Sequence, residues 1–238
     1  MAIVVVLAAM SATLSQCRAP DSAQPAEPAS SSTATTRSTT SPHATPTSTS
    51  PTPPPAVVHP VTVDELGATW RPGCPVGPEL LRRVEVNYVG FDGQTHRGEL
   101  VVHQDVVADV TAIFEQLHRM HYPIAKMRTV ADYPGAEDEL SMEDNNTSAF
   151  NCRLLPSGRA WALHAYGRAI DVNPLINPFI DGGGDIQPKT AGPYLDRTRT
   201  DPGILHGGDP AVRTFTDRGW RWGGDWRSPK DYQHFERS

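Results

Sequence analysis

The stretch "RRVEVNYVGFDGQTHRGELVVHQ", Arg82 to Gln104, decides the fold class. It contains two runs rich in β-branched and aromatic residues, Val84 to Phe91 and Arg97 to Gln104. The turn-forming pair Asp92-Gly93 lies between them, and this pattern predicts a β-hairpin.

Directly after the hairpin, apolar residues recur at helical spacing, which predicts a helix through about His121 with Asp105 as its N-terminal cap. The apolar positions are Val106, Val107, Val110, Ile113, Phe114, Leu117 and Met120. Pro123 ends this helix, and "IAKMRTV" predicts a further strand that ends near Arg128. Helices and strands do not alternate as βαβ units, so we expect an α+β domain with an antiparallel sheet and flanking helices.

Two segments precede the hairpin region. Residues 1–17 are a short apolar run that ends at Cys17, which indicates a secretory signal, and "LSQC" resembles a bacterial lipoprotein box. Residues 18–58 are almost entirely Ser, Thr, Pro and Ala, so they lack the apolar surface needed to fold and are expected to be a disordered linker. Residues 59–238 then form the folded domain. We expect an extracytoplasmic protein, either a lipoprotein anchored to the outer face of the cell membrane or a secreted one.

The net charge limits which partners the chain can bind, and the cysteine content indicates its compartment. The chain of 238 residues carries a net charge of −6, and this charge belongs to the domain because the charges before residue 59 cancel. An acidic domain lacks the basic face that nucleic acids require, so we expect no nucleic-acid partner and no electrostatic docking on anionic lipid. We expect a monomer whose membrane contact is limited to a lipid anchor at Cys17. With Cys17 assigned to the anchor, Cys74 and Cys152 remain and predict one disulfide in an oxidising compartment.

Two stretches carry candidate metal ligands: "WALHAYGRAID", Trp161 to Asp171, and "DYQHFE", Asp231 to Glu236. A catalytic zinc site requires three protein ligands and one open position, and His164, Asp171 and His234 would supply two imidazoles and a carboxylate. Gly167 would let the backbone turn between the two near ligands. The alternative is that these are ordinary polar residues, since a His and an Asp at this spacing occur often by chance.

Residues around the last His suggest supporting roles. Asp231 lies three residues before His234, where a carboxylate could act as general base without occupying a coordination position. Glu236 could orient His234 from behind. Phe235 would give the site a dry wall. If no metal is bound, the acids are solvated charges near the chain end.

The blocks "WALHAYGRAIDVNP" and "GWRWGGDW…DYQHFE" resemble the two signature blocks of the VanY-like zinc D-alanyl-D-alanine carboxypeptidases and L-alanyl-D-glutamate endopeptidases. This family has the hedgehog/DD-peptidase fold. The stretch "NTSAFNCR", Asn146 to Arg153, is similar to the segment before the first block in one branch of the family. The likeness covers approximately residues 95–236.

The resemblance implies roles for individual residues. His164, Asp171 and His234 match the zinc ligands, and Asp231 matches the catalytic acid/base. Arg128 matches the arginine that binds substrate near the scissile carbonyl, and Arg153 is the competing candidate for substrate binding. Ala162 stands where the family has Ser, and this departure affects substrate preference but leaves the metal ligands unchanged.

The function implied is a secreted zinc metallopeptidase that hydrolyses peptidoglycan stem peptides as a D,D-carboxypeptidase, with Asp231 as general base. Two alternatives stay open: an L-Ala-D-Glu-type endopeptidase, and a non-catalytic zinc-containing module that binds the cell wall. A third, a disulfide-stabilised adhesion domain, would hold no metal. No G-x-S-x-G motif is present, and both domain cysteines are assigned to a disulfide, so a serine or cysteine hydrolase is not expected.

Overall fold

The structure is a computed structural model, and it describes residues 53–155 and 158–238. The predicted signal segment 1–17 with Cys17, and the predicted linker as far as residue 52, lie outside the described residues. Strand β1 (Val57–Pro60) already includes the last two residues of the predicted linker. Within the described ranges, no helix combines the length and hydropathy needed to cross a membrane.

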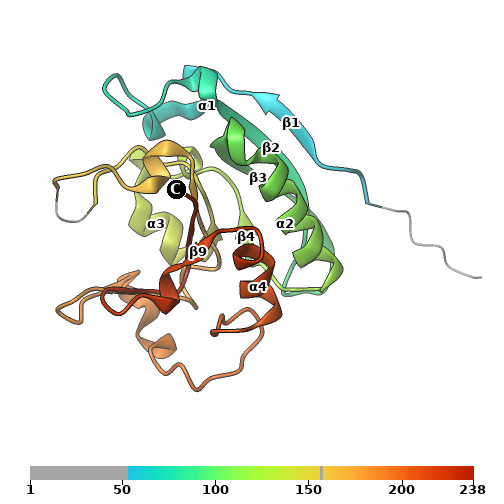
Figure 1. Ribbon diagram of the computed structural model, residues 1–238, viewed down its shortest axis with the longest axis vertical. Helices are drawn as coiled ribbons and strands as arrows, with labels where there is room; N and C mark the ends of the chain where they lie inside the picture. Colours follow the sequence, from blue (N-terminus) through green and yellow to red (C-terminus); the bar gives the residue numbers. More distant parts are fainter. Residues whose placement is uncertain (1–52, 156–157) are drawn as a thin grey trace, which may run out of the picture. The chain divides into compact units, whose positions relative to one another are not determined.

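The predicted hairpin is confirmed. Strands β2 (Leu81–Val89) and β3 (Thr95–His103) pair antiparallel along their whole length, and β1 pairs antiparallel with the other edge of β2 (Figure 1). The backbone N–H of Gly93 donates to the carbonyl of Gly90 at 2.9 Å, so the chain reverses at the predicted turn. The resulting sheet has the order β1-β2-β3.

The predicted helix is also present, as α2 (Val107–Arg119), but its predicted cap is wrong. A 3₁₀ turn, η3 (Gln104–Val106), precedes the helix, and the imidazole Nδ1 of His103 accepts the backbone N–H of Asp105 at 3.3 Å. The carboxylate of Asp105 instead accepts a hydrogen bond from Arg168 at 2.6 Å. The cap moves because the chain begins to turn at the end of β3, two residues earlier than the apolar pattern suggests.

The remaining elements are short. The helices are α1 (Val63–Leu66), α3 (Asp138–Glu143) and α4 (Pro210–Thr216), with 3₁₀ turns η1 (Gly67–Thr69), η2 (Pro78–Leu80), η4 (Val130–Asp132), η5 (Pro134–Ala136), η6 (Leu163–Tyr166), η7 (Lys189–Tyr194) and η8 (Gly223–Asp225). The strands are β4 (Lys126–Met127), β5 (Asn146–Thr147), β6 (Ala169–Asp171), β7 (Phe179–Ile180), β8 (Ile186–Gln187), β9 (Arg221–Trp222), β10 (Lys230–Asp231) and β11 (His234–Glu236). They form the antiparallel sheets β6-β11-β9 and β10-β7-β8 and the parallel pair β4-β5, so the predicted α+β class is confirmed.

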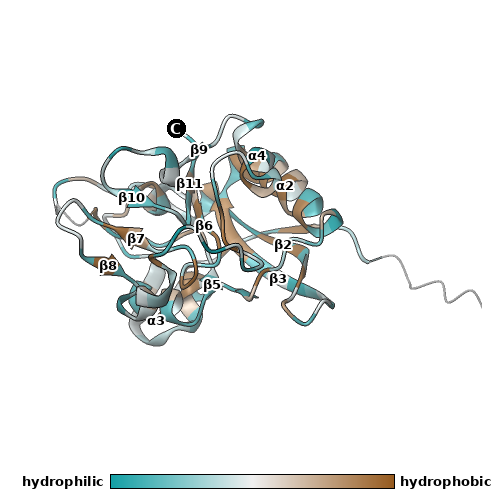
Figure 2. Cartoon of the chain, turned by 90° about the horizontal axis from the view of Figure 1, so that it is seen from below, coloured by the Kyte–Doolittle hydropathy of each residue, from teal (hydrophilic) through white to brown (hydrophobic). Residues whose placement is uncertain are grey.

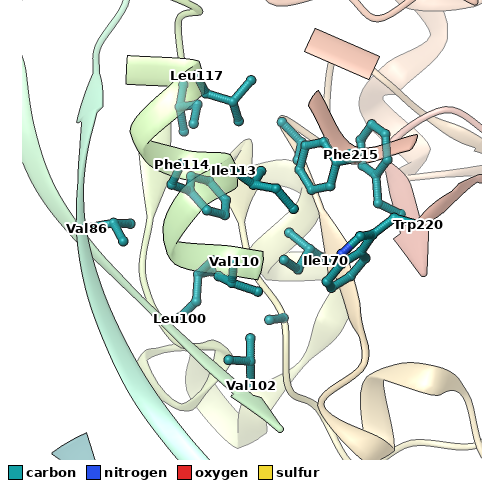
Figure 3. Packing of buried hydrophobic residues seen from close by; sticks show 14 of the residues in the cluster. Val86, Leu100, Val102, Val110, Ile113, Phe114, Leu117, Ile170, Phe215 and Trp220 are labelled. Atoms are coloured by element: carbon teal, nitrogen blue, oxygen red, sulfur yellow. The ribbon is translucent and has the colours of Figure 1, made fainter. Parts of the chain in front are cut away.

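One apolar core joins the hairpin to the C-terminal strands. Side chains of α2 meet those of the hairpin on one side, and those of Ile170 on β6, Phe215 on α4 and Trp220 on the other (Figure 3). Colouring by hydropathy shows apolar residues along β2, β3 and α2 (Figure 2). Phe235 on β11 is fully buried and stacks on Phe215 with ring centroids 3.8 Å apart. The core therefore fixes the strand that carries His234.

The predicted disulfide is confirmed. Cys74 and Cys152 are bonded, with their Cα atoms 6.0 Å apart, and they belong to a second buried cluster around Leu81 and Phe150. Disulfides persist mainly in proteins outside the cytoplasm. The bond therefore supports an extracytoplasmic location.

We predict that replacing both cysteines, as Cys74→Ser with Cys152→Ser, lowers the free energy of unfolding by up to about 4 kcal/mol, because a long loop is no longer closed in the unfolded chain. Urea unfolding of the oxidised protein and the double variant measures this difference. Thiol labelling of the unfolded, unreduced protein is the control. Two reactive thiols at residues 74 and 152 would contradict the pairing.

Candidate metal centre

The structure brings together the three predicted ligands from separate elements. His164 lies in η6, Asp171 ends β6, and His234 begins β11. The antiparallel register of β6 and β11 places His234 directly opposite Asp171. All three side chains are buried, and one possible ligand atom of each lies within 4.8 Å of the others.

Gly167 makes the turn between His164 and Asp171 possible. Its φ of +66° lies in the left-handed region, where residues with a Cβ are strained. A Cβ added there would lie 2.6 Å from the backbone nitrogen of His103. That nitrogen donates to the Gly167 carbonyl at 2.8 Å, so the close approach also attaches the turn to the end of β3.

The separations of the donor atoms fit a small tetrahedral ion. His164 Nε2 lies 3.1 Å from His234 Nδ1 and 3.1 Å from Asp171 Oδ2, and His234 Nδ1 lies 3.0 Å from Asp171 Oδ1. Ligand atoms at zinc–nitrogen and zinc–oxygen distances of about 2.0–2.1 Å in a tetrahedron are separated by roughly 3.3 Å. The separation of the two imidazole nitrogens is within a few tenths of an ångström of this value, and each nitrogen lies equally close to one of the two Asp171 oxygens.

The outer ring nitrogens determine which atoms are free to bind an ion. His164 Nδ1 lies 2.6 Å from the carbonyl oxygen of Ala149, which can only accept, so Nδ1 carries the proton. His234 Nε2 lies 3.4 Å from the Glu236 carboxylate and donates to it in the same way. In neutral rings the two inner nitrogens then present lone pairs to each other, an arrangement that a cation between them stabilises.

The ionisation of the group also favours a positive charge at its centre. Burial alone would raise the pKa of Asp171, but His164 and His234 hold it well below its usual range. Burial alone would lower the pKa of His234, but hydrogen bonds to Asp171 and Glu236 raise it to about 10. The residues present therefore fit a metal cation, which would replace the proton held there.

The group opens on a cavity of about 410 Å³. Its wall is largely apolar and includes Leu163, Phe179 and Trp226, together with the carboxylate of Asp231. The Oδ1 atom of Asp231 is buried, and no described residue donates a hydrogen bond to it. Burial raises the pKa of this carboxyl to about 7.

The two candidate arginines occupy different places. Arg153 lines the cavity, and its Nε lies 2.8 Å from the carboxylate of Asp138. Arg128 is not among the cavity-lining residues, and it donates to Asp144 at 2.7 Å and to the Tyr133 hydroxyl at 3.2 Å. Arg153 is thus the arginine that the fold brings to the cavity.

One predicted neighbour is misplaced. Phe235 does not form a wall of the cavity, because alternation along β11 turns its ring into the core, on the side opposite His234. Trp226 takes that place, with its ring centroid 5.4 Å from that of His234. The predicted contact of Glu236 with His234 is confirmed, and Arg221 also donates to this carboxylate.

The sequence analysis did not assign a role to Gly223 or Gln233, two residues in or beside the site. A Cβ at Gly223 would lie 2.6 Å from the carbonyl oxygen of Asp231, so this glycine lets η8 pack against β10. The Gly-Gly pair in "GWRWGGDW" was the available signal. Gln233 lines the cavity and is 2% exposed, and nothing in the sequence singled it out.

Comparison with known families gives one match. Residues 156–237, about a third of the chain, match a peptidase M15 family model described as D-alanyl-D-alanine carboxypeptidase. The matched range contains His164, Asp171, Asp231 and His234, and both arginines lie before it. No curated protein and no solved structure matches the chain. The family resemblance drawn from the two sequence blocks is confirmed over this range.

We predict that Gly167→Ala destabilises the fold more than Gly93→Ala. Both glycines have positive φ, and a left-handed Ala costs about 1–2 kcal/mol, but only residue 167 also meets a neighbouring backbone atom. No neighbouring atom lies within 4 Å of a Cβ at position 93. Urea unfolding of both variants checks the order. Equal losses would show that the turn at residue 167 can open without cost.

We predict that the purified protein binds one equivalent of a transition-metal ion and that His164→Gln weakens this binding more than about 100-fold, since even changes behind the ligands cost about 10- to 100-fold. The control is His206→Gln, a half-buried His that pairs with Asp209 away from the site. Metal content after dialysis against a graded series of chelator concentrations measures both. Equal affinity in the two variants would exclude His164 as a ligand.

Proposed function

We propose that this protein is a zinc peptidase that trims peptidoglycan stem peptides, in the manner of a D,D-carboxypeptidase. The match of residues 156–237 to the D-alanyl-D-alanine carboxypeptidase family model supports this proposal. The observation that carries the proposal is the buried group of His164, Asp171 and His234, which opens on a cavity beside the unpaired carboxylate of Asp231.

The donor set supports zinc as the metal. Two imidazole nitrogens and one carboxylate oxygen are a common ligand set of catalytic zinc, which keeps a fourth position open. When bound, zinc supplies a water of lowered pKa and polarises a carbonyl oxygen. Glu236 and the Ala149 carbonyl orient the two imidazoles for this role.

Asp231 is the proposed general base and acid. Its Oδ1 accepts a proton as water adds to the scissile carbonyl carbon, and it returns this proton to the amide nitrogen as the carbon–nitrogen bond breaks. Water is consumed, and a carboxylate and an amine are formed. The support for this role is that Asp231 lines the cavity and no described residue donates to its Oδ1, which leaves that atom free for the proton.

Arg153 is the proposed substrate-binding cation. Its guanidinium lies in the cavity wall, and Asp138 holds it from one side, so its remaining donors are available to a substrate carbonyl or carboxylate. Arg128 was expected near the scissile carbonyl, but it does not line the cavity, and its Nε and Nη2 donate to Tyr133 and Asp144. We therefore assign substrate contact to Arg153.

The residues that line the cavity are compatible with cleavage at either of two peptide bonds of the stem peptide. Apolar walls at Leu163 and Trp226 suit the methyl groups of alanine residues, which favours the D-Ala-D-Ala end of the stem peptide. Ala162 also lines the cavity and offers no hydroxyl for a terminal carboxylate, which favours an L-Ala-D-Glu-type endopeptidase as the second candidate. In both cases the substrate lies outside the cytoplasm, which agrees with the Cys74–Cys152 disulfide.

A non-catalytic wall-binding module fits the site less well. A metal that only stabilises a fold is normally closed by four protein ligands, whereas this group offers three and faces a cavity. A purely structural metal site also does not require an unpaired buried carboxylate such as that of Asp231. An anchored enzyme would reach the wall through the predicted linker, and peptidoglycan would be its partner.

We predict that Asp231→Asn lowers kcat for stem-peptide hydrolysis by at least about 100-fold while metal content is unchanged, because the general base is lost and the ligands are kept. Mass spectrometry of digested peptidoglycan stem peptides names the bond and measures the rate. The matched control is Asp181→Asn, since Asp181 lines the same cavity but accepts hydrogen bonds from the backbone of Gly183 and Asp185. Unchanged turnover in Asp231→Asn would remove Asp231 from the mechanism, and intact stem peptides with a metal-loaded wild type would remove the proposed function.

A further inference from the structure

The cavity wall contains a buried carboxamide with an unused acceptor. Gln233 is only 2% exposed, it lines the cavity, and no described residue donates a hydrogen bond to its Oε1 atom. Buried polar groups in folded proteins are nearly always hydrogen-bonded, so an exception next to a cavity calls for an explanation. A donor on a bound molecule would supply the missing partner.

The backbone holds this side chain in one place. The carbonyl of Gln233 accepts the N–H of Val172 at 2.9 Å, which connects it to the end of β6. The carbonyl of the preceding Tyr232 accepts the indole N–H of Trp222 at 2.9 Å. Gln233 therefore sits on a fixed segment between Asp231 and His234, the proposed base and one proposed ligand.

We propose that Gln233 determines substrate specificity: its Oε1 accepts the main-chain N–H of the substrate residue immediately before the scissile bond. This inference rests on the proposed carboxypeptidase function. The Oε1 atom can only accept, so its missing partner is a donor, and the main chain of a peptide substrate offers N–H groups as donors. The substrate class is thus a peptide with a secondary amide at that position.

The chemistry of the substrate selects this N–H among the possible donors. The residue after the scissile bond ends in a carboxylate, and its own nitrogen becomes the leaving amine that Asp231 protonates. The N–H one residue before the bond is then the nearest main-chain donor that is not consumed by the reaction. This N–H belongs to the same residue as the reacting carbonyl, and Gln233 is the chain neighbour of His234, one of the proposed ligands.

The test compares two probes on the full-length protein: Nα,Nε-diacetyl-L-Lys-D-Ala-D-Ala, and the same peptide methylated on the nitrogen of its first D-Ala. Three variants accompany the wild type. Gln233→Met keeps the side-chain volume and removes the acceptor, Gln233→Glu keeps an acceptor, and Gln187→Met changes a more exposed amide in the same cavity.

We expect N-methylation to lower kcat/KM of the wild type about tenfold, the factor typical of one lost hydrogen bond. In Gln233→Met the two probes should react at similar rates, and the unmethylated probe should lose about tenfold relative to wild type with zinc content unchanged. Gln187→Met and Gln233→Glu should keep the preference for the unmethylated probe.

The outcomes separate this inference from the proposed function. A wild-type preference that persists in Gln233→Met overturns the assignment of Gln233 and leaves the peptidase function standing. Loss of zinc in both Gln233 variants would mean that the residue supports the metal centre, and this also overturns the assignment. A zinc-loaded wild type that hydrolyses neither probe overturns the proposed carboxypeptidase function, and the inference with it.

Discussion

The antiparallel register between β6 and β11 is the constraint on which the site depends. It sets His234 opposite Asp171 and Phe235 opposite Ile170, so one strand supplies a candidate ligand and a core residue at successive positions. A slip of one residue would turn Phe235 toward the cavity and His234 into the apolar core. Because Phe235 stacks on Phe215 in that core, its packing specifies the register and hence the position of His234.

Charge explains why such a buried group is tolerated. Asp171, Asp231 and Glu236 lie close to two imidazoles in a largely apolar wall, and burying uncompensated carboxylates is unfavourable. Arg221 pairs with Glu236 at the rim, which leaves Asp171 and the inner ring nitrogens facing each other. A bound cation would complete this balance, so metal binding and folding stability are expected to be coupled.

The sequence predicted a feature correctly where that feature lies within a single helix, hairpin or signature block. Apolar spacing located the hairpin and α2, and the two signature blocks located His164, Asp171 and His234. It was less informative where distant segments meet, because local patterns do not record which side chains become neighbours. The choice between Arg128 and Arg153 depends on how the segment between them folds, and the capping role of His103 depends on a turn that the apolar pattern does not mark.

The disulfide connects the compartment to the site. Cys152 is bonded to Cys74, its carbonyl accepts a hydrogen bond from Arg71 at 2.9 Å, and its N–H donates to the carbonyl of Thr69 at 3.0 Å. Arg153 directly follows Cys152. Ala149, three residues before Cys152, supplies the carbonyl that orients His164. Holding this segment against the N-terminal turns therefore positions both a cavity-lining cation and one imidazole. Oxidation outside the cytoplasm, where the proposed substrate lies, would then favour the geometry on which the proposed chemistry depends.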